Sequence, residues 1–242
     1  MKKAQVTVFI IIGVVILLTI FLVFLFREKI FYKKEMVKFA ELSGYPEEFK
    51  IVAENIDDCI QSVSKEGKNL IMLQGGYFLP ELYLFKNELK IAYWYYKDKD
   101  ISPNLITFQS EISKYIEFAL PLCIENIWDT NNVVIATETK PISNVKIKNN
   151  SIEIKIKYPV TVKRGNLSAT LEEFTASLET NLTDILIEAK EILNEITKTG
   201  YIDTTELMSK ETHGGMFSDP DTNATIIYIT RGDETLMFGI KE

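Results

Sequence analysis

Histidine and cysteine are scarce in this sequence of 242 residues, which contains one histidine and two cysteines. A zinc site needs more of these ligands than the chain has, so we expect no metal site and no cofactor. A Ser-His-Asp or Cys-His catalytic set would have to use His213, which we expect in a loop, and no nucleophile motif surrounds that residue. Gln74-Gly75-Gly76-Tyr77 lacks the Gly-Lys-Ser/Thr of a phosphate loop, and Asp219-Pro220-Asp221 lacks the ligand spacing of a calcium loop. These absences predict that the protein is not an enzyme.

Basic residues are also few outside the N-terminus. Six of the 27 Lys and Arg residues, but only one of the 34 Asp and Glu residues, lie in residues 1–34. Residues 35–242 therefore hold 21 basic and 33 acidic residues, a net charge of −12. Nucleic-acid binding depends on clustered Lys and Arg, and no such stripe is present, so we expect no nucleic-acid partner.

A long uncharged run is present at the N-terminus. Residues 5–26 are 22 consecutive uncharged residues, dominated by Ile, Val, Leu and Phe. As a helix they would span about 30 Å, the thickness of the hydrocarbon core of a bilayer. The run is too long for an ordinary secretory signal, and no small-residue cleavage site follows it. It predicts a transmembrane helix that continues as an amphipathic stalk to about residue 43, where Gly44 and Pro46 provide a stop.

The first residues resemble a known leader. Residues 2–9, Lys-Lys-Ala-Gln-Val-Thr-Val-Phe, are similar to an archaeal class III signal peptide, the leader of archaeal type IV pilin-like proteins. In that pattern a basic leader ends in Gly or Ala, and the mature chain begins with Gln followed two positions later by a hydroxyl residue. Ala4, Gln5 and Thr7 fit, which implies processing between Ala4 and Gln5 and export of the rest. Phe9 replaces the acidic residue that pilins use during assembly, so polymerisation stays open.

A second, looser resemblance covers most of the chain. Its features are Cys59, Leu73-Gln74-Gly75-Gly76-Tyr77, Cys123 and Tyr158-Pro159-Val160. They resemble an uncharacterised family of membrane-anchored proteins of small-genome archaea that begin with the same kind of leader. This resemblance implies membrane anchoring and no particular activity.

The side of the membrane is predicted from the leader. The charges that flank the apolar run slightly favour a cytoplasmic body, but long domains translocate largely regardless of flanking charge. The leader implies export, so we place the body outside the cell. Three Asn-x-Ser/Thr triplets are then possible glycosylation sites, at Asn149, Asn166 and Asn223, and Asn149 is the best acceptor because it lies at a predicted turn. Asn181 also begins such a triplet but is well placed to cap a helix.

Two helices are predicted early in the body. Residues 46–66 and 103–127 both carry apolar side chains at helical spacing. The expected apolar face of the second helix consists of Ile112, Tyr115, Ile116, Ala119, Leu122, Cys123 and Ile127. Pro46 suits the first turn of one helix and Gly67 ends it, whereas Ser102 caps the other. Each helix directs its apolar face toward a core.

The two cysteines fall on these apolar faces. Cys59 and Cys123 lie on different helices, and in an exported protein this placement predicts a disulfide bond. A bridge that closes so long a loop stabilises a fold by about 4 kcal/mol. The alternative is two buried free thiols.

Period-two patterns predict strands in the rest of the body. The clearest is 151–162, joined to 145–148 through a two-residue turn at Asn149-Asn150. The remaining elements are predicted at 70–73, 88–96, 168–180, 225–230 and 235–240, with a helix at 182–198. The aromatic run 93–96 is either a binding surface or a strand whose rings pack on both faces of a sheet, and we favour the second.

The sequence thus predicts a leader at 1–4, a transmembrane helix at 5–26 and one α+β domain at 44–242 with a mostly antiparallel sheet. We expect a pilin-like, membrane-anchored surface protein with a structural or adhesive role, whose partners are the lipid bilayer and itself or other envelope proteins. The alternatives are a monomeric ectodomain that binds a ligand or partner, and an anchored domain that faces the cytoplasm. An enzyme of unrecognised type would require convergent acids near His213.

Overall fold

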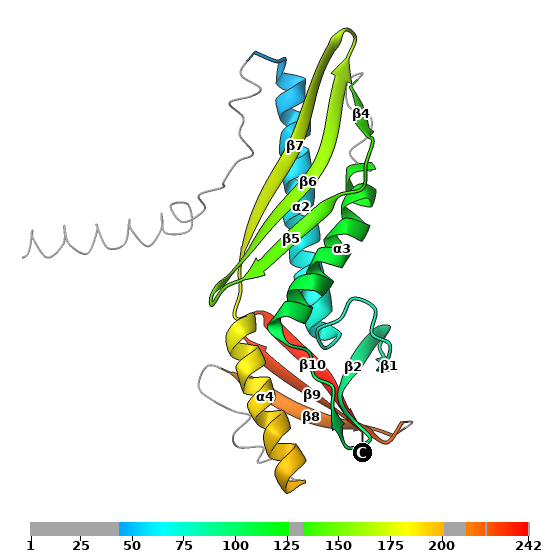
Figure 1. Cartoon of the computed structure of the whole chain (residues 1–242), viewed down its shortest axis with the longest axis vertical. Coiled ribbons are helices and arrows are strands. Elements are labelled where there is room, and N and C mark those ends of the chain that lie inside the picture. Colours follow the sequence, from blue (N-terminus) through cyan, green and yellow to red (C-terminus); the bar gives the residue numbers. More distant parts are fainter. Residues whose placement is uncertain (1–43, 126–132, 201–211, 221, 242) are drawn as a thin grey trace, which may run out of the picture. The chain divides into compact units, whose positions relative to one another are not determined.

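A computed structural model describes residues 44–125, 133–200, 212–220 and 222–241. Within these residues the fold is α+β, with two sheets and three helices, as Figure 1 shows. The helices are α2 (Glu47–Leu73), α3 (Leu105–Glu125) and α4 (Leu182–Thr199). None of these described helices is both long and apolar enough to cross a bilayer. The predicted leader, transmembrane run and stalk lie outside the described residues.

The larger sheet has six strands and is mixed. Its order is β1 (Tyr83–Lys86), β2 (Leu89–Tyr96), β10 (Glu234–Lys241), β9 (Ala224–Arg231) and β8 (His213–Asp219), with β3 (Lys99–Asp100) also paired to β2. Strands β2 and β10 are parallel, and the other pairs are antiparallel. Lys86 of one outer strand forms an ion pair with Asp219 of the other, at 2.9 Å. The sheet is therefore strongly curved, because its outer strands meet.

The second sheet has four strands built around β6 (Ser151–Arg164). Strand β7 (Leu167–Glu179) pairs along one edge of β6, whereas β5 (Ile142–Ile147) and β4 (Val134–Thr137) share the other edge end to end. Pairing with β5 ends at Lys157 and pairing with β4 begins at Val160. Pro159 lies in the gap between them. Since proline cannot donate to a neighbouring strand, the break in pairing falls where its missing N–H costs least.

One core connects both sheets through α2. This helix of 27 residues contacts β7 of the four-stranded sheet and β10 of the six-stranded sheet. Its length is about 40 Å at the helical rise, enough to run along both. In Figure 1, α2 lies behind β5, β6 and β7, α3 runs beside it, and α4 lies in front of β8, β9 and β10. Alternate side chains of β6, from Ile152 to Val162, complete this core.

The first helix is longer than predicted. Gly67 lies inside α2 rather than at its end, and residues 70–73, predicted as a strand, form its last turns. A Cβ at position 67 would lie 2.5 Å from a ring carbon of Tyr115. Gly67 therefore permits close packing of α3 against α2 instead of ending the helix. The helix ends at Leu73, and the capping residue Gln74 is followed by two glycines with positive φ.

The second helix begins later than predicted. Asn104 caps α3, because its side-chain oxygen accepts a hydrogen bond from the Thr107 N–H at 2.9 Å. Ser102, the predicted cap, donates its own N–H to Asp100 instead. Leu122 was expected on the apolar face but is half exposed, whereas Glu111 is buried. The buried stripe is thus rotated from the predicted one.

Most later elements are confirmed. The strand at 151–162, its hairpin partner, the strand at 168–180, the helix at 182–198 and the final hairpin correspond to β6, β5, β7, α4 and β9–β10. Gly200 ends α4 in the left-handed conformation, as expected. His213 was predicted in a loop, and this is wrong, because it begins β8. Strands β1, β3, β4 and β8 and the division into two sheets were not predicted.

Candidate functional site

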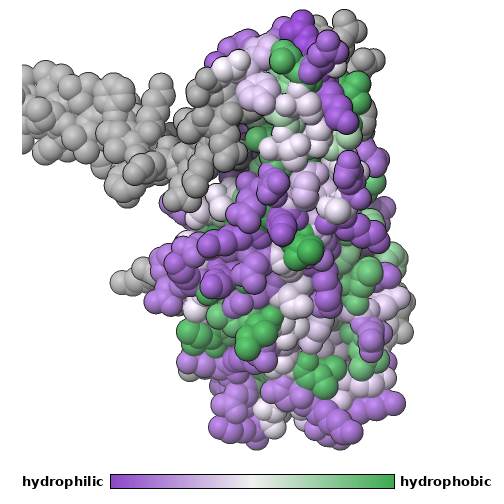
Figure 2. Space-filling view, turned by 45° about the horizontal axis from the view of Figure 1, so that its top comes forward, coloured by the Kyte–Doolittle hydropathy of each residue, from purple (hydrophilic) through white to green (hydrophobic). Residues whose placement is uncertain are grey.

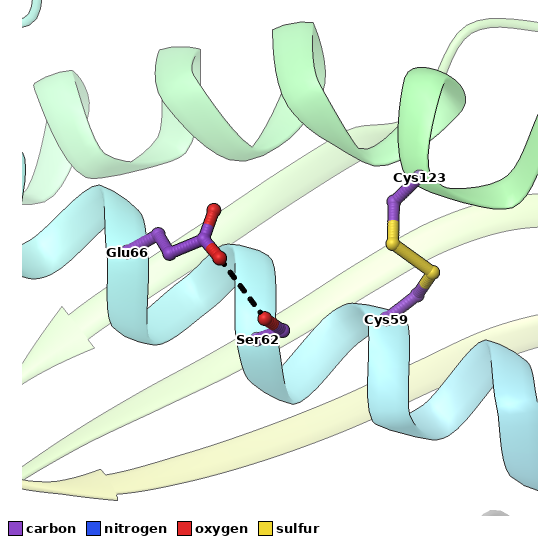
Figure 3. Close-up of a disulfide and its surroundings, with 4 residues drawn as sticks. All are labelled: Cys59, Ser62, Glu66 and Cys123. Carbon is purple, nitrogen blue, oxygen red and sulfur yellow. Dashed lines mark hydrogen bonds between the residues drawn. A yellow bond between two sulfur atoms is a disulfide. The ribbon is translucent and has the colours of Figure 1, made fainter. Parts of the chain in front are cut away.

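A disulfide bond joins α2 to α3. Cys59 and Cys123, the pair expected from the sequence, are bonded with a Cα–Cα distance of 5.9 Å, across 64 residues of sequence. Figure 3 shows the bond between neighbouring turns of the two helices, with Ser62 and Glu66 hydrogen bonded one turn further along α2. Cys59 is buried, and Cys123 is partly exposed. The bond fixes the spacing of the two helices that cover the four-stranded sheet.

The most unusual polar feature is a buried ion pair between α2 and β10. Lys68 of α2 contacts Glu234, the first residue of β10, and their side chains are only 6% and 3% exposed. Charged side chains are rarely this buried unless they are paired and hydrogen bonded. The pair links the helix that crosses both sheets to the central strand of the six-stranded sheet.

The second carboxylate oxygen of Glu234 is also satisfied. It accepts hydrogen bonds from the Thr180 hydroxyl at 3.1 Å and the Asn181 N–H at 2.6 Å. The Thr180 hydroxyl oxygen in turn accepts the Leu182 N–H. Thr180 therefore caps α4, and the side chain of Asn181, the expected cap, makes no capping hydrogen bond. A carboxylate at the N-terminus of α4 is also favoured by the helix dipole.

A pocket of about 380 Å³ opens beside this ion pair. Three connections line it, namely the β5–β6 turn, the β7–α4 junction and the β9–β10 turn. The lining residues are Asn150, Glu179, Thr180, Asn181, Asp233 and Glu234. All six are polar and three are acidic, so the pocket offers oxygen acceptors that suit a cationic or hydroxyl-bearing ligand. Within the described residues, no group of three or more His, Cys, Asp or Glu has the geometry of a metal site.

A second, wider depression lies along α4. Its volume is about 580 Å³, and its acidic residues recur along the helix with Ile187 and Ile192 between them. The lining residues are Asp184, Ile187, Glu188, Glu191, Ile192, Glu195 and Arg231. Arg231 pairs with Asp184 at 2.6 Å. This surface is a strongly negative face of α4, rather than a site with defined ligand geometry.

A polar cluster closes the curved six-stranded sheet. Asp219 accepts hydrogen bonds from Lys86 and from both the N–H and the hydroxyl of Thr222. The Thr222 hydroxyl and Lys86 hold the pKa of the Asp219 carboxyl below its usual value. Burial raises the pKa of the neighbouring Tyr93. The cluster explains Asp219 as the residue that holds the end of β8 beside Lys86 and Thr222.

The aromatic strand packs on both faces of its sheet, as favoured from the sequence. Trp94 stacks on Phe238 in the main core, with their ring centres 4.2 Å apart, and its indole N–H donates to the Gly75 carbonyl. Tyr93 and Tyr96 lie on the other face, with their ring centres 5.3 Å apart. The run is therefore a structural strand.

The Gln74-Gly75-Gly76-Tyr77 motif also has a structural explanation. Both glycines have positive φ. A Cβ at Gly76 would lie 2.7 Å from Pro103 and 2.8 Å from Phe108, at the base of α3. The Gln74 side chain holds the following turn by donating to the Tyr77 and Phe78 carbonyls. The motif ends α2 and packs that end tightly against α3 and β2.

The candidate glycosylation sites lie in three different turns. Asn149, Asn166 and Asn223 are all exposed, in the β5–β6, β6–β7 and β8–β9 turns respectively. His213, the only histidine, is exposed at the start of β8. It does not line the pocket at the sheet junction or the depression on α4. Ala4 and Gln5, the predicted processing site, lie outside the described residues.

Sequence reasoning missed the Lys68–Glu234 pair. Its residues are 166 positions apart, and no local pattern connects them. One signal was present: Lys68 follows Ile56, Ile60 and Ser64 at a spacing of four, and so continues the buried stripe of α2. Ending the predicted helix at Gly67 removed Lys68 from that stripe.

Exposed apolar residues are spread over several elements. On the face shown in Figure 2, hydrophobic residues form separate green patches between hydrophilic ones. Phe118 and Leu122 lie one turn apart on the outer side of α3, and both are more than half exposed. Phe78 packs against Phe118, with their ring centres 5.6 Å apart.

Comparison with known proteins gives no match. No family model fits the chain, and no curated protein and no solved structure is significantly similar to it.

Proposed function

We propose that this protein is a single-pass, membrane-anchored cell-surface protein whose disulfide-bonded domain faces outward and has a structural or adhesive role. The carrying observation is the uncharged run at residues 5–26, followed by a body whose two cysteines are bonded to each other. A run of this length suits a bilayer span. Disulfide bonds persist in oxidising compartments outside the cytosol, so the Cys59–Cys123 bond favours an outward domain over one that faces the cytoplasm.

The resemblance of residues 2–9 to a class III signal peptide supports a pilin-like origin. In this proposal the chain is processed before Gln5 and anchored by residues 5–26. The body contributes surface for contact with other envelope components. Half-exposed apolar side chains on α3, at Phe118 and Leu122, support such a contact role.

Membrane placement is tested by fractionating cells that express the full chain. We expect the protein to sediment with membranes at high speed, to resist extraction by carbonate and to enter solution only with detergent. A variant that lacks residues 1–43 should remain in the aqueous fraction. Full-length protein that is monodisperse in water without detergent would overturn the anchor.

Topology is tested by thiol labelling of intact cells with a membrane-impermeant reagent. An outward, disulfide-bonded domain is labelled only after treatment with a reductant, because Cys59 and Cys123 are the only cysteines in the chain. The Cys59→Ser/Cys123→Ser variant provides the background signal. Labelling that appears only after the membrane is permeabilised would place the domain in the cytoplasm.

Leader processing is tested by mass spectrometry of the purified protein's N-terminus. A chain that begins at Gln5 supports cleavage by a pilin-type peptidase. An intact Met1 would identify residues 5–26 as a plain signal anchor. The variant Ala4→Leu should block cleavage without changing membrane association.

A second candidate function is an ectodomain that binds a small ligand, and the polar pocket beside Glu234 favours it. Its exposed acidic residues, Glu179 and Asp233, suit a cationic or polyhydroxyl compound. Electron microscopy separates the two functions, because filaments or clusters favour assembly and dispersed particles favour a monomeric binder. A panel of polyamines and sugars, measured by thermal shift on wild type and on Asp233→Asn, tests the pocket directly.

A further inference from the structure

The four Asn-x-Ser/Thr triplets of the chain differ sharply in accessibility. At Asn166 all three residues, Asn166-Leu167-Ser168, are exposed, with Leu167 48% exposed. None of the other three triplets is exposed throughout. The surroundings of each triplet therefore distinguish one acceptor from the rest.

Asn166 occupies the two-residue turn between β6 and β7. Its neighbour Gly165 has φ of +56°, and a Cβ placed on it would have no atom within 4 Å. Within the described residues, the side chain of Asn166 makes no hydrogen bond and neither does the Ser168 hydroxyl, whereas the Ser168 carbonyl accepts one from Tyr45. The triplet thus stands at an open hairpin tip with both of its functional groups available.

The triplet at Asn181 has the opposite surroundings. Its middle residue, Leu182, is fully buried, and the Thr183 hydroxyl donates to the Lys148 carbonyl. The Asn181 side chain lies against the β9–β10 turn, where its amide nitrogen would be 3.7 Å from a Cβ on Gly232. At the start of α4, the surrounding residues make the Asn181 amide and the Thr183 hydroxyl poorly accessible to a glycosyl transferase.

The triplets at Asn149 and Asn223 are intermediate cases. Asn223 is exposed, but Ala224 is buried and Thr225 lies in β9 between β8 and β10. Asn149 is exposed, but Ser151 begins β6 and is paired to Glu179 of β7. In both, the asparagine is exposed but the hydroxyl residue is only partly exposed, whereas Ser168 is exposed although it pairs with Lys163 of β6.

We propose that Asn166 is the N-glycosylation site of this protein. The inference rests on the proposed outward placement of the domain, because glycans are attached to exported segments. It revises the expectation from sequence, which ranked Asn149 first. An N-glycan is bulky and requires a surface position, and the β6–β7 tip offers the most open one among the triplets.

The reaction needs a lipid-linked oligosaccharide and a membrane transferase. The Asn166 amide nitrogen bonds to C1 of the first sugar, and the bond between C1 and the phosphate oxygen breaks. The electron pair of that bond leaves with the lipid phosphate, and the displaced amide proton passes to a base of the transferase. The Ser168 hydroxyl serves recognition of the triplet and is unchanged in the product.

The test is the intact mass of the full chain, expressed with its own N-terminal residues in a cell that N-glycosylates exported proteins. The chain carries an added Asn-Gly-Thr triplet after Glu242 as a reporter of exposure to the transferase. We expect the wild-type chain with the reporter to carry two glycans, one on Asn166 and one on the added triplet. Asn166→Gln and Ser168→Ala should each lose one glycan mass, and Ser168→Thr should keep it.

The matched controls are Asn149→Gln, Asn181→Gln and Asn223→Gln, each of which should keep both glycan masses. An unchanged thermal midpoint for Asn166→Gln shows that its loss of mass does not reflect misfolding. A modified reporter with an unmodified Asn166, or a glycan lost only in a control variant, would overturn this proposal and leave the outward placement standing. If neither the reporter nor Asn166 is modified, the outward placement and this site are overturned together.

Discussion

Gly76 illustrates how a single residue can be required for two separate physical reasons. Its φ of +94° is a conformation that side chains other than glycine rarely adopt. Its Cα also faces Phe108 and Pro103 so closely that a Cβ would overlap both. The residue ends α2 and at the same time lets the base of α3 approach it.

We therefore predict that Gly76→Ala lowers the free energy of unfolding by about 2–4 kcal/mol, through backbone strain and overpacking together. Gly200→Ala is the matched control, because Gly200 also has positive φ but a Cβ added to it would have no atom within 4 Å. It should cost only about 1 kcal/mol. Urea unfolding followed by circular dichroism measures both, and equal losses would contradict the role of close packing.

Asp219 carries a pH dependence that follows from its lowered pKa. Aspartate in an unfolded chain titrates near pH ~4, and hydrogen bonds from Thr222 and Lys86 lower the folded pKa. A group whose pKa is lowered by folding stabilises the fold above its unfolded pKa, and this contribution disappears as pH falls through the folded pKa.

We predict that Asp219→Asn is less stable than wild type by a constant amount between about pH 5 and 7. The difference should shrink as pH falls below about 4, because wild-type Asp219 then becomes neutral as well. Urea midpoints measured at several pH values test this. A difference that does not change with pH would show that the charge of Asp219 makes no contribution.

At the scale of elements, β6 shows how a central strand accommodates a proline. Pro159 lacks an N–H, and pairing along that edge of β6 is divided between β5 and β4 at this position. The other edge pairs with β7 along almost its whole length, with an irregularity at the same place. The Tyr158-Pro159-Val160 motif is thus explained by sheet geometry rather than by a ligand.

The buried Lys68–Glu234 pair connects elements that are distant in sequence, so its removal should be costly. We predict that Lys68→Met lowers the free energy of unfolding by about 3–5 kcal/mol, because it leaves the Glu234 carboxylate buried without its cation. The double variant Lys68→Met/Glu234→Gln should recover part of this loss, since a neutral amide oxygen can still accept from Thr180 and Asn181.

Urea unfolding of wild type, Lys68→Met, Glu234→Gln and the double variant forms a thermodynamic cycle. A double variant whose loss of stability equals the sum of the two single losses would show that the pair is not coupled. Wild-type stability in Lys68→Met would show that the ion pair adds nothing to the fold.

At the scale of the whole domain, the Cys59–Cys123 bond constrains the unfolded chain. The two cysteines are 64 residues apart, and a bridge that closes so long a loop contributes about 4 kcal/mol through chain entropy. It also joins the helix that crosses both sheets to the one that covers β5. Reduction should therefore lower the stability of the whole domain, not of one helix.

We predict that a reductant lowers the free energy of unfolding of the domain, residues 44–242, by about 4 kcal/mol. Urea unfolding of the full chain in detergent measures this loss. Cys59→Ala/Cys123→Ala is the control, because its stability should be the same with and without reductant. A wild-type curve unaffected by complete reduction would contradict the prediction.

The sequence by itself determined the elements whose signals are local. The alternation of β6, the Asn149-Asn150 hairpin, the stripe and glycine cap of α4 and the final hairpin each depend on residues a few positions apart. The disulfide was also predictable, because its two cysteines fall on apolar faces of separate helices.

Only the tertiary structure decided what depends on contacts between distant residues. Gly67 is a local stop signal, but Tyr115 packs against it and the helix continues to Leu73. The parallel pairing of β2 with β10, the burial of Lys68 against Glu234 and the pocket at the sheet junction all join segments far apart in the sequence. Local propensities cannot specify such contacts, because their free energy comes from packing and burial that exist only once the chain is folded.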